Sequence, residues 1–149
     1  MKISNNGINL IKKFEGLRLE SYKASSSERY YTIGYGHYGS DVKSGMVITE
    51  KEAEELLIND IAKFESYVND LLDVYDFSQN QFDALVSFTY NCGKINLLRL
   101  TDNKKRTIEQ ISNALLLYNK CCGKTLKGLQ KRRLEEQKLF NLVNYVIIW

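Results

Sequence analysis

The spacing of apolar residues changes at Gly16, and this change constrains the fold more than any other feature of the chain. Up to Gly16, apolar residues recur at helical spacing after cap candidates at positions 4–6; they are Ile8, Leu10, Ile11 and Phe14. Further on, alternation in residues 17–20 and the β-prone residues 30–33 predict short antiparallel strands, joined by a serine loop at 25–27. Glu15 is therefore expected in the last turn of a helix, immediately before a small sheet.

The rest of the chain carries helix signals. Residues 49–52 have the form of a capping box and open a helical period that continues to Val68. Ser78 begins a further helix for which Gly93 is a natural stop. Residues 107–110 form a second capping box, and residues 129–140 predict a charged final helix. Because a sheet this small needs helices to cover it, the 149 residues are expected to form one compact domain with two lobes.

The charge balance says little about partners. Lysine and arginine number 21 against 18 for aspartate and glutamate, too small an excess to indicate a nucleic-acid-binding protein. Basic residues gather near the C-terminal end: Lys120, Lys124, Lys127, Lys131, Arg132 and Arg133. We expect a solvated helix face there, with Glu135 and Glu136 as charge partners. The alternative is a surface that meets anionic polymers such as cell wall or phosphate backbones.

The cysteines indicate a chain folded in a cytoplasm. Cys92, Cys121 and Cys122 are odd in number and lack a CxxC spacing, so we expect reduced thiols, with neither a disulfide framework nor a metal site.

The N-terminus lacks the pattern of a secretory signal, and no stretch approaches the ~20 apolar residues of a membrane span. We therefore expect a soluble chain without stable membrane insertion, and its apolar tail 142–149 is expected to pack on the domain or on a second copy.

Four segments in this order resemble one known family: Phe14–Lys23, Tyr30–His37, Gln79–Phe88 and Gly128–Glu135. The family is that of the phage-type lysozymes, the muramidase endolysins of tailed bacteriophages and prophages. The resemblance implies one α+β, lysozyme-like domain over residues 1–149. A small N-terminal antiparallel sheet lobe of about residues 1–50 would face a mostly helical C-terminal lobe, residues 51–149, across a cleft.

The resemblance also implies an activity. It is hydrolysis of the β-1,4 bond between N-acetylmuramic acid and N-acetylglucosamine in bacterial peptidoglycan, with no cofactor and with inversion at the reacting carbon. The expected protein is a monomer that stays in the host cytoplasm until another protein opens the membrane and releases it to the cell wall. A chitin-type glycosidase is the nearest alternative enzyme.

The catalytic residues of the family match only in part. A Glu and an Asp flank the scissile bond in that family, and a Thr helps to place water; Glu15 and Thr32 match, but Ala24 stands at the Asp position. Glycosidic cleavage needs a proton donor beside the leaving oxygen, and apolar neighbours of Glu15 would raise its pKa. The alternative for Glu15 is a structural pairing with Arg18 or Arg132.

The loop after Ala24 suggests where a second carboxylate is found. The family pattern is Glu, eight residues, Asp, five residues, Thr, whereas seven residues separate Ala24 from Thr32 here. Glu28 lies in this longer loop. Our hypothesis is that Glu28 folds back to supply the missing carboxylate, or that Glu15 and Thr32 work with a bound water at reduced efficiency. A solvent-facing Glu in a serine-rich loop is the alternative.

Four residues are candidates for substrate binding: Tyr35, His37, Gln81 and Asn91. Aromatic faces pack against sugar C–H groups, and amides bond N-acetyl and hydroxyl groups. A structural hydrogen bond from His37 to a carboxylate of the long helix, such as Asp60, is the competing interpretation of the histidine. For Gln81 it is ordinary helix surface.

Two other protein classes compete with the enzyme. One is a non-catalytic wall-binding protein, which would keep the fold after Ala24 removed half of the chemistry. The other is a basic helical nucleic-acid binder using residues 120–133, which is disfavoured because no recognised motif supports it.

Overall fold

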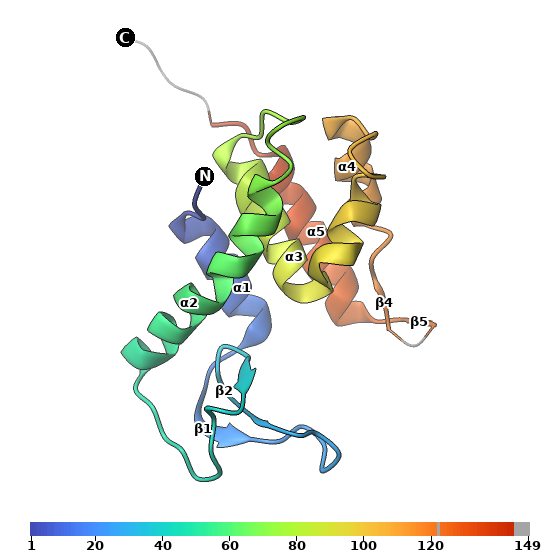
Figure 1. Ribbon diagram of the computed structural model, residues 1–149. Helices are drawn as coiled ribbons and strands as arrows, with labels where there is room; N and C mark the ends of the chain where they lie inside the picture. The colour runs from blue at the N-terminus through green and yellow to red at the C-terminus, as the bar shows by residue number, and fades with distance from the viewer. Residues whose placement is uncertain (122, 145–149) are drawn as a thin grey trace. The chain divides into compact units, whose positions relative to one another are not determined.

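The computed structural model describes residues 1–121 and 123–144. The described residues form helices and strands in the order α1–β1–β2–β3–α2–α3–α4–β4–β5–α5 (Figure 1). The bounds of the helices are Asn5–Glu15 for α1, Glu50–Asn69 for α2, Gln79–Leu100 for α3, Ile108–Leu115 for α4 and Lys127–Asn141 for α5. The bounds of the strands are Arg18–Tyr22 for β1, Tyr31–Gly34 for β2, His37–Gly39 for β3, Lys120–Cys121 for β4 and Lys124–Thr125 for β5.

The chain divides into two compact units, and each is described by itself. One unit comprises residues 11–63, and the other comprises residues 1–10 with 64–149. The boundaries fall inside α1 and α2, so each of these helices supplies residues to both units. The predicted lobe boundary near residue 50 lies at the start of α2. The boundary between the two units lies within that helix, between residues 63 and 64.

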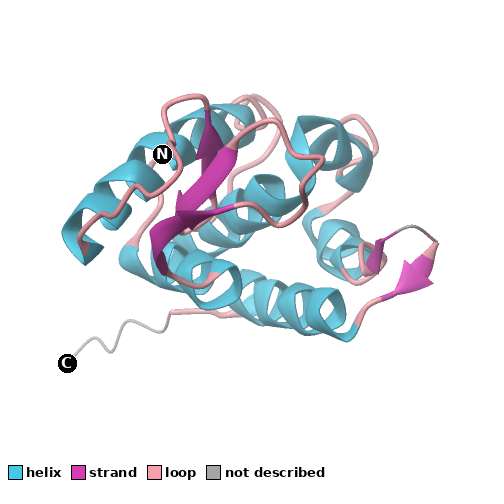
Figure 2. Cartoon of the chain, turned by 90° about the horizontal axis from the view of Figure 1, so that it is seen from below, coloured by secondary structure: helices cyan, strands magenta, loops and turns pink. Residues whose placement is uncertain are grey.

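The unit of residues 11–63 contains the predicted antiparallel sheet, with strand order β1–β2–β3. Figure 2 draws these strands in magenta. Thr32 of β2 pairs with Tyr22 of β1 and with Tyr38 of β3. The register between β1 and β2 shifts, since Arg18 pairs with Gly34. The apolar core of this unit is built from Ile33, Val42, Ile48, Ala53, Leu57 and Ile61, all buried.

The starts of α2, α3 and α4 were predicted correctly from local signals, whereas α5 begins at Lys127 rather than at the predicted Leu129. Thr49 and Glu52 exchange the two hydrogen bonds of a capping box at the start of α2, and Ser78 with Gln81 does so at α3. Thr107 with Gln110 does the same at α4. Each box satisfies backbone N–H groups that lack partners in a first helical turn.

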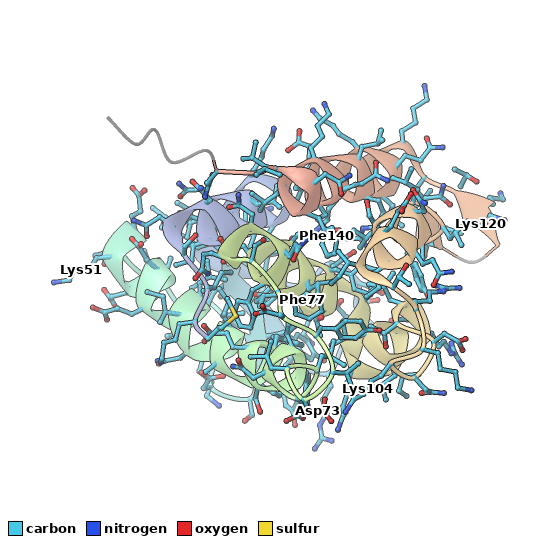
Figure 3. The ribbon with its side chains drawn as sticks, turned by 90° about the horizontal axis from the view of Figure 1, so that it is seen from above. Lys51, Asp73, Phe77, Lys104, Lys120 and Phe140 are labelled. Atoms are coloured by element: carbon cyan, nitrogen blue, oxygen red, sulfur yellow. The ribbon has the colours of Figure 1, made fainter. Side chains whose placement is uncertain are left out.

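Gly93 breaks α3, as its sequence position predicted. Its φ of 84° and ψ of 170° are not helical, but the chain resumes a helical course up to Leu100, a continuation that the sequence did not predict. The helical core around α3 includes Phe77 and Phe140, both buried (Figure 3).

The turn after α3 adopts the left-handed region at three successive non-glycine residues, with φ of 49° at Asp102, 51° at Asn103 and 69° at Lys104. Such residues cost roughly 1–2 kcal/mol each. An ion pair of 2.7 Å joins Lys104 Nζ to Asp73 Oδ2, and the two side chains meet in Figure 3. This contact ties the turn to the loop before α3 and helps to hold the unfavourable conformation.

The prediction that the charged residues of α5 form a solvated face is wrong for three of them. Arg132, Arg133 and Glu136 are buried, the last two with no exposed surface. Glu136 Oε1 lies 2.6 Å from Arg133 Nε, and Glu136 Oε2 accepts a hydrogen bond of 2.6 Å from Ser87 Oγ of α3. The prediction that Glu136 partners these arginines is confirmed, but the pairing is buried inside the unit of residues 1–10 and 64–149, which we call the helical unit. The lysines of the same segment are exposed.

Two further features differ from expectation or lie outside it. Strands β4 and β5 form a short antiparallel hairpin that the sequence did not predict. Residues 145–149 of the apolar tail lie outside the described residues, so their expected packing stays a prediction. The beginning of the tail is attached to α3, because Asn80 Nδ2 donates to the Leu142 carbonyl at 3.0 Å.

Replacing Glu136 by Gln is expected to lower the free energy of unfolding by about 3–5 kcal/mol, because the buried guanidinium of Arg133 loses the carboxylate with which it is paired. Urea unfolding followed by circular dichroism measures the loss. Glu135→Gln, on the same helix but half-buried, is the matched control, and its expected loss is under about 1 kcal/mol. Equal losses in the two variants would contradict a special role for the buried carboxylate.

Candidate active site

Glu15 is the last residue of α1, as the sequence predicted, and its side chain is half-buried. Gly16 follows with a φ of 71°, a conformation that glycine adopts without a Cβ penalty. Its N–H donates to the Lys12 carbonyl at 3.0 Å, which closes the helix. Lys12 is also ion-paired with Glu54 of α2 at 3.2 Å. The helix end that carries the Glu15 carboxylate is therefore fixed by a backbone turn and by a charge contact.

Thr32 lies in the central strand of the sheet and is half-buried. Its neighbours across the ladders are Tyr22 on one side and Tyr38 on the other. A threonine hydroxyl is both a donor and an acceptor, so a central-strand position gives it a fixed backbone from which to orient a water or a sugar hydroxyl.

Glu28 folds back across the β1–β2 loop. Its Oε2 accepts a hydrogen bond of 3.2 Å from the backbone N–H of Ala24, and its own N–H donates to the Ser25 carbonyl at 3.1 Å. The carboxylate thus reaches the backbone of the residue that stands where the family has Asp. This contact brings Glu28 and Ala24 together within the loop that leads into the strand of Thr32.

His37 is held between two carboxylates. Its Nδ1 lies 2.7 Å from Asp60 Oδ2, and its Nε2 lies 2.8 Å from Asp41 Oδ2. The predicted pairing with Asp60 is confirmed, whereas Asp41, four residues beyond the histidine, was missed. Burial by itself lowers the pKa of His37, but the hydrogen bonds to Asp60 and Asp41 outweigh it and raise the pKa above the ordinary value of 6.5. The imidazole therefore joins β3 to α2, and both contacts favour its protonated form.

The tyrosines divide between core and surface. Tyr35 is only 7% exposed, and the ammonium of Lys12 lies 5.4 Å from the centre of its ring. Tyr30 and Tyr38 meet edge to face with ring centres 5.5 Å apart, and Tyr38 is exposed. The face open to a sugar is therefore that of Tyr38 rather than of Tyr35.

The other two candidates belong to the helical unit. Gln81 is engaged in the α3 capping box, where its Oε1 accepts from the Ser78 N–H at 2.9 Å. Asn91 is exposed, and its Oδ1 accepts a hydrogen bond of 2.9 Å from Arg133 Nη2. A guanidinium has only donors, so Arg133 fixes the orientation of the Asn91 amide and leaves its Nδ2 directed away from the arginine.

In the described part of the chain, no group of three or more His, Cys, Asp or Glu side chains is arranged to hold a metal ion. Cys92 is a free thiol. Burial raises the pKa of the Cys92 thiol, against the opposing effect of Arg133.

The His37 contacts predict a pH-dependent contribution to stability. Because the folded-state pKa is raised, the contribution is fully present below about pH 6.5 and is lost as the pH rises through the folded-state pKa. His37→Gln should therefore destabilise the protein most at about pH 6 and least in alkaline solution, measured by urea unfolding between about pH 5.5 and 9. Asp41→Asn should lower the His37 pKa measured by NMR. A destabilisation by His37→Gln that grows with rising pH would contradict this account.

Comparison with known proteins places this geometry in a family. Residues 12–136 match the family described as phage lysozyme. The chain is 51% identical over 146 residues to the endolysin of Bacillus phage PZA, covering 95% of this chain and 55% of that protein. It thus spans about half the length of the Bacillus phage endolysins that it matches.

Solved structures agree in fold over nearly the whole chain. The endolysin from Escherichia coli O157:H7 phage FAHEc1 has a TM-score of 0.80 and 37% identity, with 95% of this chain and 94% of that chain covered. The muramidase domain of SpmX from Asticaccaulis excentricus has a TM-score of 0.81 and 34% identity, with 95% and 99% covered. The predicted α+β lysozyme-like fold is confirmed, and the chain belongs to the phage lysozyme family.

Proposed function

We propose that this protein is a peptidoglycan hydrolase, a muramidase that cleaves the β-1,4 bond between N-acetylmuramic acid and N-acetylglucosamine. Membership of the phage lysozyme family and likeness to a muramidase domain and to phage endolysins support the proposal. The observation that carries it for this chain is the hydrogen bond from the Ala24 N–H to Glu28. This contact brings a carboxylate to the backbone of Ala24, the residue at the family's Asp position, and so supports a catalytic role for Glu28.

The proposed mechanism uses two carboxylates and a hydroxyl. Glu15 donates a proton to the leaving glycosidic oxygen as positive charge develops on the sugar ring. Glu28, held at Ala24, accepts a proton from the attacking water, which the Thr32 hydroxyl helps to orient. By the family resemblance, water attacks the face opposite to the leaving group, and the configuration is inverted.

Substrate contacts are proposed for the four residues predicted from sequence, with different support. Asn91 is the best supported, because its amide is exposed and oriented by Arg133. The hydrogen bonds of His37 and Gln81 have structural roles of their own, and Tyr35 is mostly buried. These three would affect binding chiefly through the elements that they hold in place.

Where the protein acts is also a proposal. As the family resemblance implies, the protein would be made in the host cytoplasm, reach the wall after release and act as a monomer; the Bacillus phage relatives are named endolysins. Within the described residues, no helix has the length and apolarity needed to span a bilayer.

The first test is the release of reducing ends from purified peptidoglycan. Glu15→Gln is expected to lower the rate by roughly 10²–10⁴-fold, the usual contribution of a general acid. Glu28→Gln keeps an oxygen acceptor for the Ala24 N–H but removes the negative charge, and a loss of about 10²-fold or more is expected. Glu20→Gln, an exposed carboxylate of β1, is the control and should retain parental activity.

A rescue variant sharpens the test of Glu28. Adding Ala24→Asp to Glu28→Gln restores a carboxylate at the family position and should recover activity. Unchanged activity in Glu28→Gln would remove Glu28 from the mechanism and favour Glu15 working with Thr32 and a bound water.

A second function is favoured by Ala24 itself, which has no acid–base group. It is a non-catalytic or weakly active wall-binding protein. Binding of the parent protein to peptidoglycan without any release of reducing ends would establish this function and overturn the muramidase proposal.

A further inference from the structure

A cationic surface lies outside the proposed active site. We define the lysine surface as Lys120 and Lys124 of the β4–β5 hairpin together with Lys127 and Lys131 of α5. All four side chains are exposed. Residues 110–134 contain no Asp or Glu, and none of the four lysines has an ion-pair partner among residues 1–121 and 123–144. Within the described residues, no carboxylate is paired with the positive charge of this surface.

The arginines of the same segment do not contribute to this surface. Arg132 and Arg133 are buried and share the carboxylate of Glu136. The exposed cations are thus all lysines. An arginine fork suits planar, bidentate recognition of carboxylates, whereas a lysine acts as a point charge on a flexible stem and binds phosphate without demanding one geometry.

The hairpin and α5 form one continuous element. The Leu126 N–H donates to the Asn119 carbonyl at 2.9 Å, closing the base of the hairpin one residue before α5 begins. Lys127 and Lys131 are four residues apart and so share a face of α5. The hairpin projects from the helices of its unit in Figure 1, and Lys120 lies at its outer side in Figure 3. Lys120 pairs with Thr125 and Cys121 pairs with Lys124, so Lys120 and Lys124 lie on opposite faces of the hairpin, and a chain-like ligand would contact both by passing around it.

We propose that the lysine surface binds phosphodiester polymers attached to the bacterial cell wall. A polymer with regularly spaced phosphates matches several unpaired lysines at once, and binding gains free energy because counterions are released from both partners. That the polymer is attached to the cell wall rests on the proposed wall-directed function, but the contact uses neither Glu15 nor Glu28. It would hold the enzyme at the wall between cleavage events.

A phospholipid surface is the competing source of phosphate. Proteins that lie in the membrane interface usually present tryptophan or tyrosine beside their lysines. Residues 119–134 contain no aromatic residue. This composition favours a water-soluble polyanion over a bilayer.

The experiment measures binding of the Glu15→Gln variant to purified walls, so that the substrate is not consumed. One portion of the walls is intact, and the other is treated with hydrofluoric acid to remove phosphodiester-linked polymers. Intact walls are expected to bind at least about tenfold more tightly at low salt. Changing the four lysines to Gln should abolish this difference. It should also lower the magnitude of the slope of log affinity against log salt by about three, because each phosphate contact contributes about 0.7–0.9 to that slope.

A matched variant removes the same net charge elsewhere. It carries Gln at four other exposed lysines: Lys2, Lys43, Lys51 and Lys105. It should keep the preference for intact walls. Equal binding to intact and treated walls, or an equal loss in the matched variant, would overturn the proposal. Lysine-dependent binding to vesicles of anionic phospholipid, without preference for intact walls, would overturn it in favour of a membrane surface.

Activity on treated walls separates this proposal from the muramidase proposal. With Glu15 present, the four-lysine variant should release reducing ends from treated walls at the parental rate, within about twofold. If the parent protein is inactive but prefers intact walls, the muramidase proposal fails and the polymer-binding proposal stands. If the parent is active without any preference for intact walls, only the polymer-binding proposal fails.

Discussion

The buried carboxylate of Glu136 is the contact on which the arrangement of the helical unit depends. It accepts a hydrogen bond from Ser87 of α3 and is ion-paired with both Arg133 and Arg132 of α5. Burial raises the pKa of Glu136, while the two arginines oppose this shift. A buried ion pair does not by itself guarantee stability, but removal of one partner is costly. Arg133 also orients Asn91, so core electrostatics extend to a proposed substrate contact.

The loop between β1 and β2 illustrates a second constraint, which is the position of the carboxylates in space. Hydrolysis of a glycosidic bond needs carboxylates at suitable places in space, not at fixed places in the sequence. The loop is two residues longer than the family spacing, and it lets Glu28 fold back to the backbone of Ala24. A displaced acid on a longer loop is the physical basis for proposing activity despite the missing Asp.

The single histidine shows how a titratable group can be used for structure. Both ring nitrogens of His37 face carboxylates, one from Asp60 of α2 and one from Asp41. A general base needs a nitrogen with an available lone pair, whereas these contacts favour the doubly protonated cation. The contact with Asp60 fixes β3 of the sheet to α2, in the same unit that carries Glu15 and Thr32.

The sequence by itself determined the end of α1, the starts of α2, α3 and α4, and the family, because capping boxes, the helix stop at Gly16 and hydrophobic period are local signals. It also proposed Glu15 and Thr32 as catalytic candidates, and it raised Glu28 as a hypothesis. Only the tertiary structure decided that Arg133 and Glu136 are buried, since charges occur all around α5 and the partner Ser87 lies 49 residues earlier. The β4–β5 hairpin was missed because strands of two residues carry almost no periodic pattern. Burial and ion pairing depend on which distant segments meet, and that choice is made by packing.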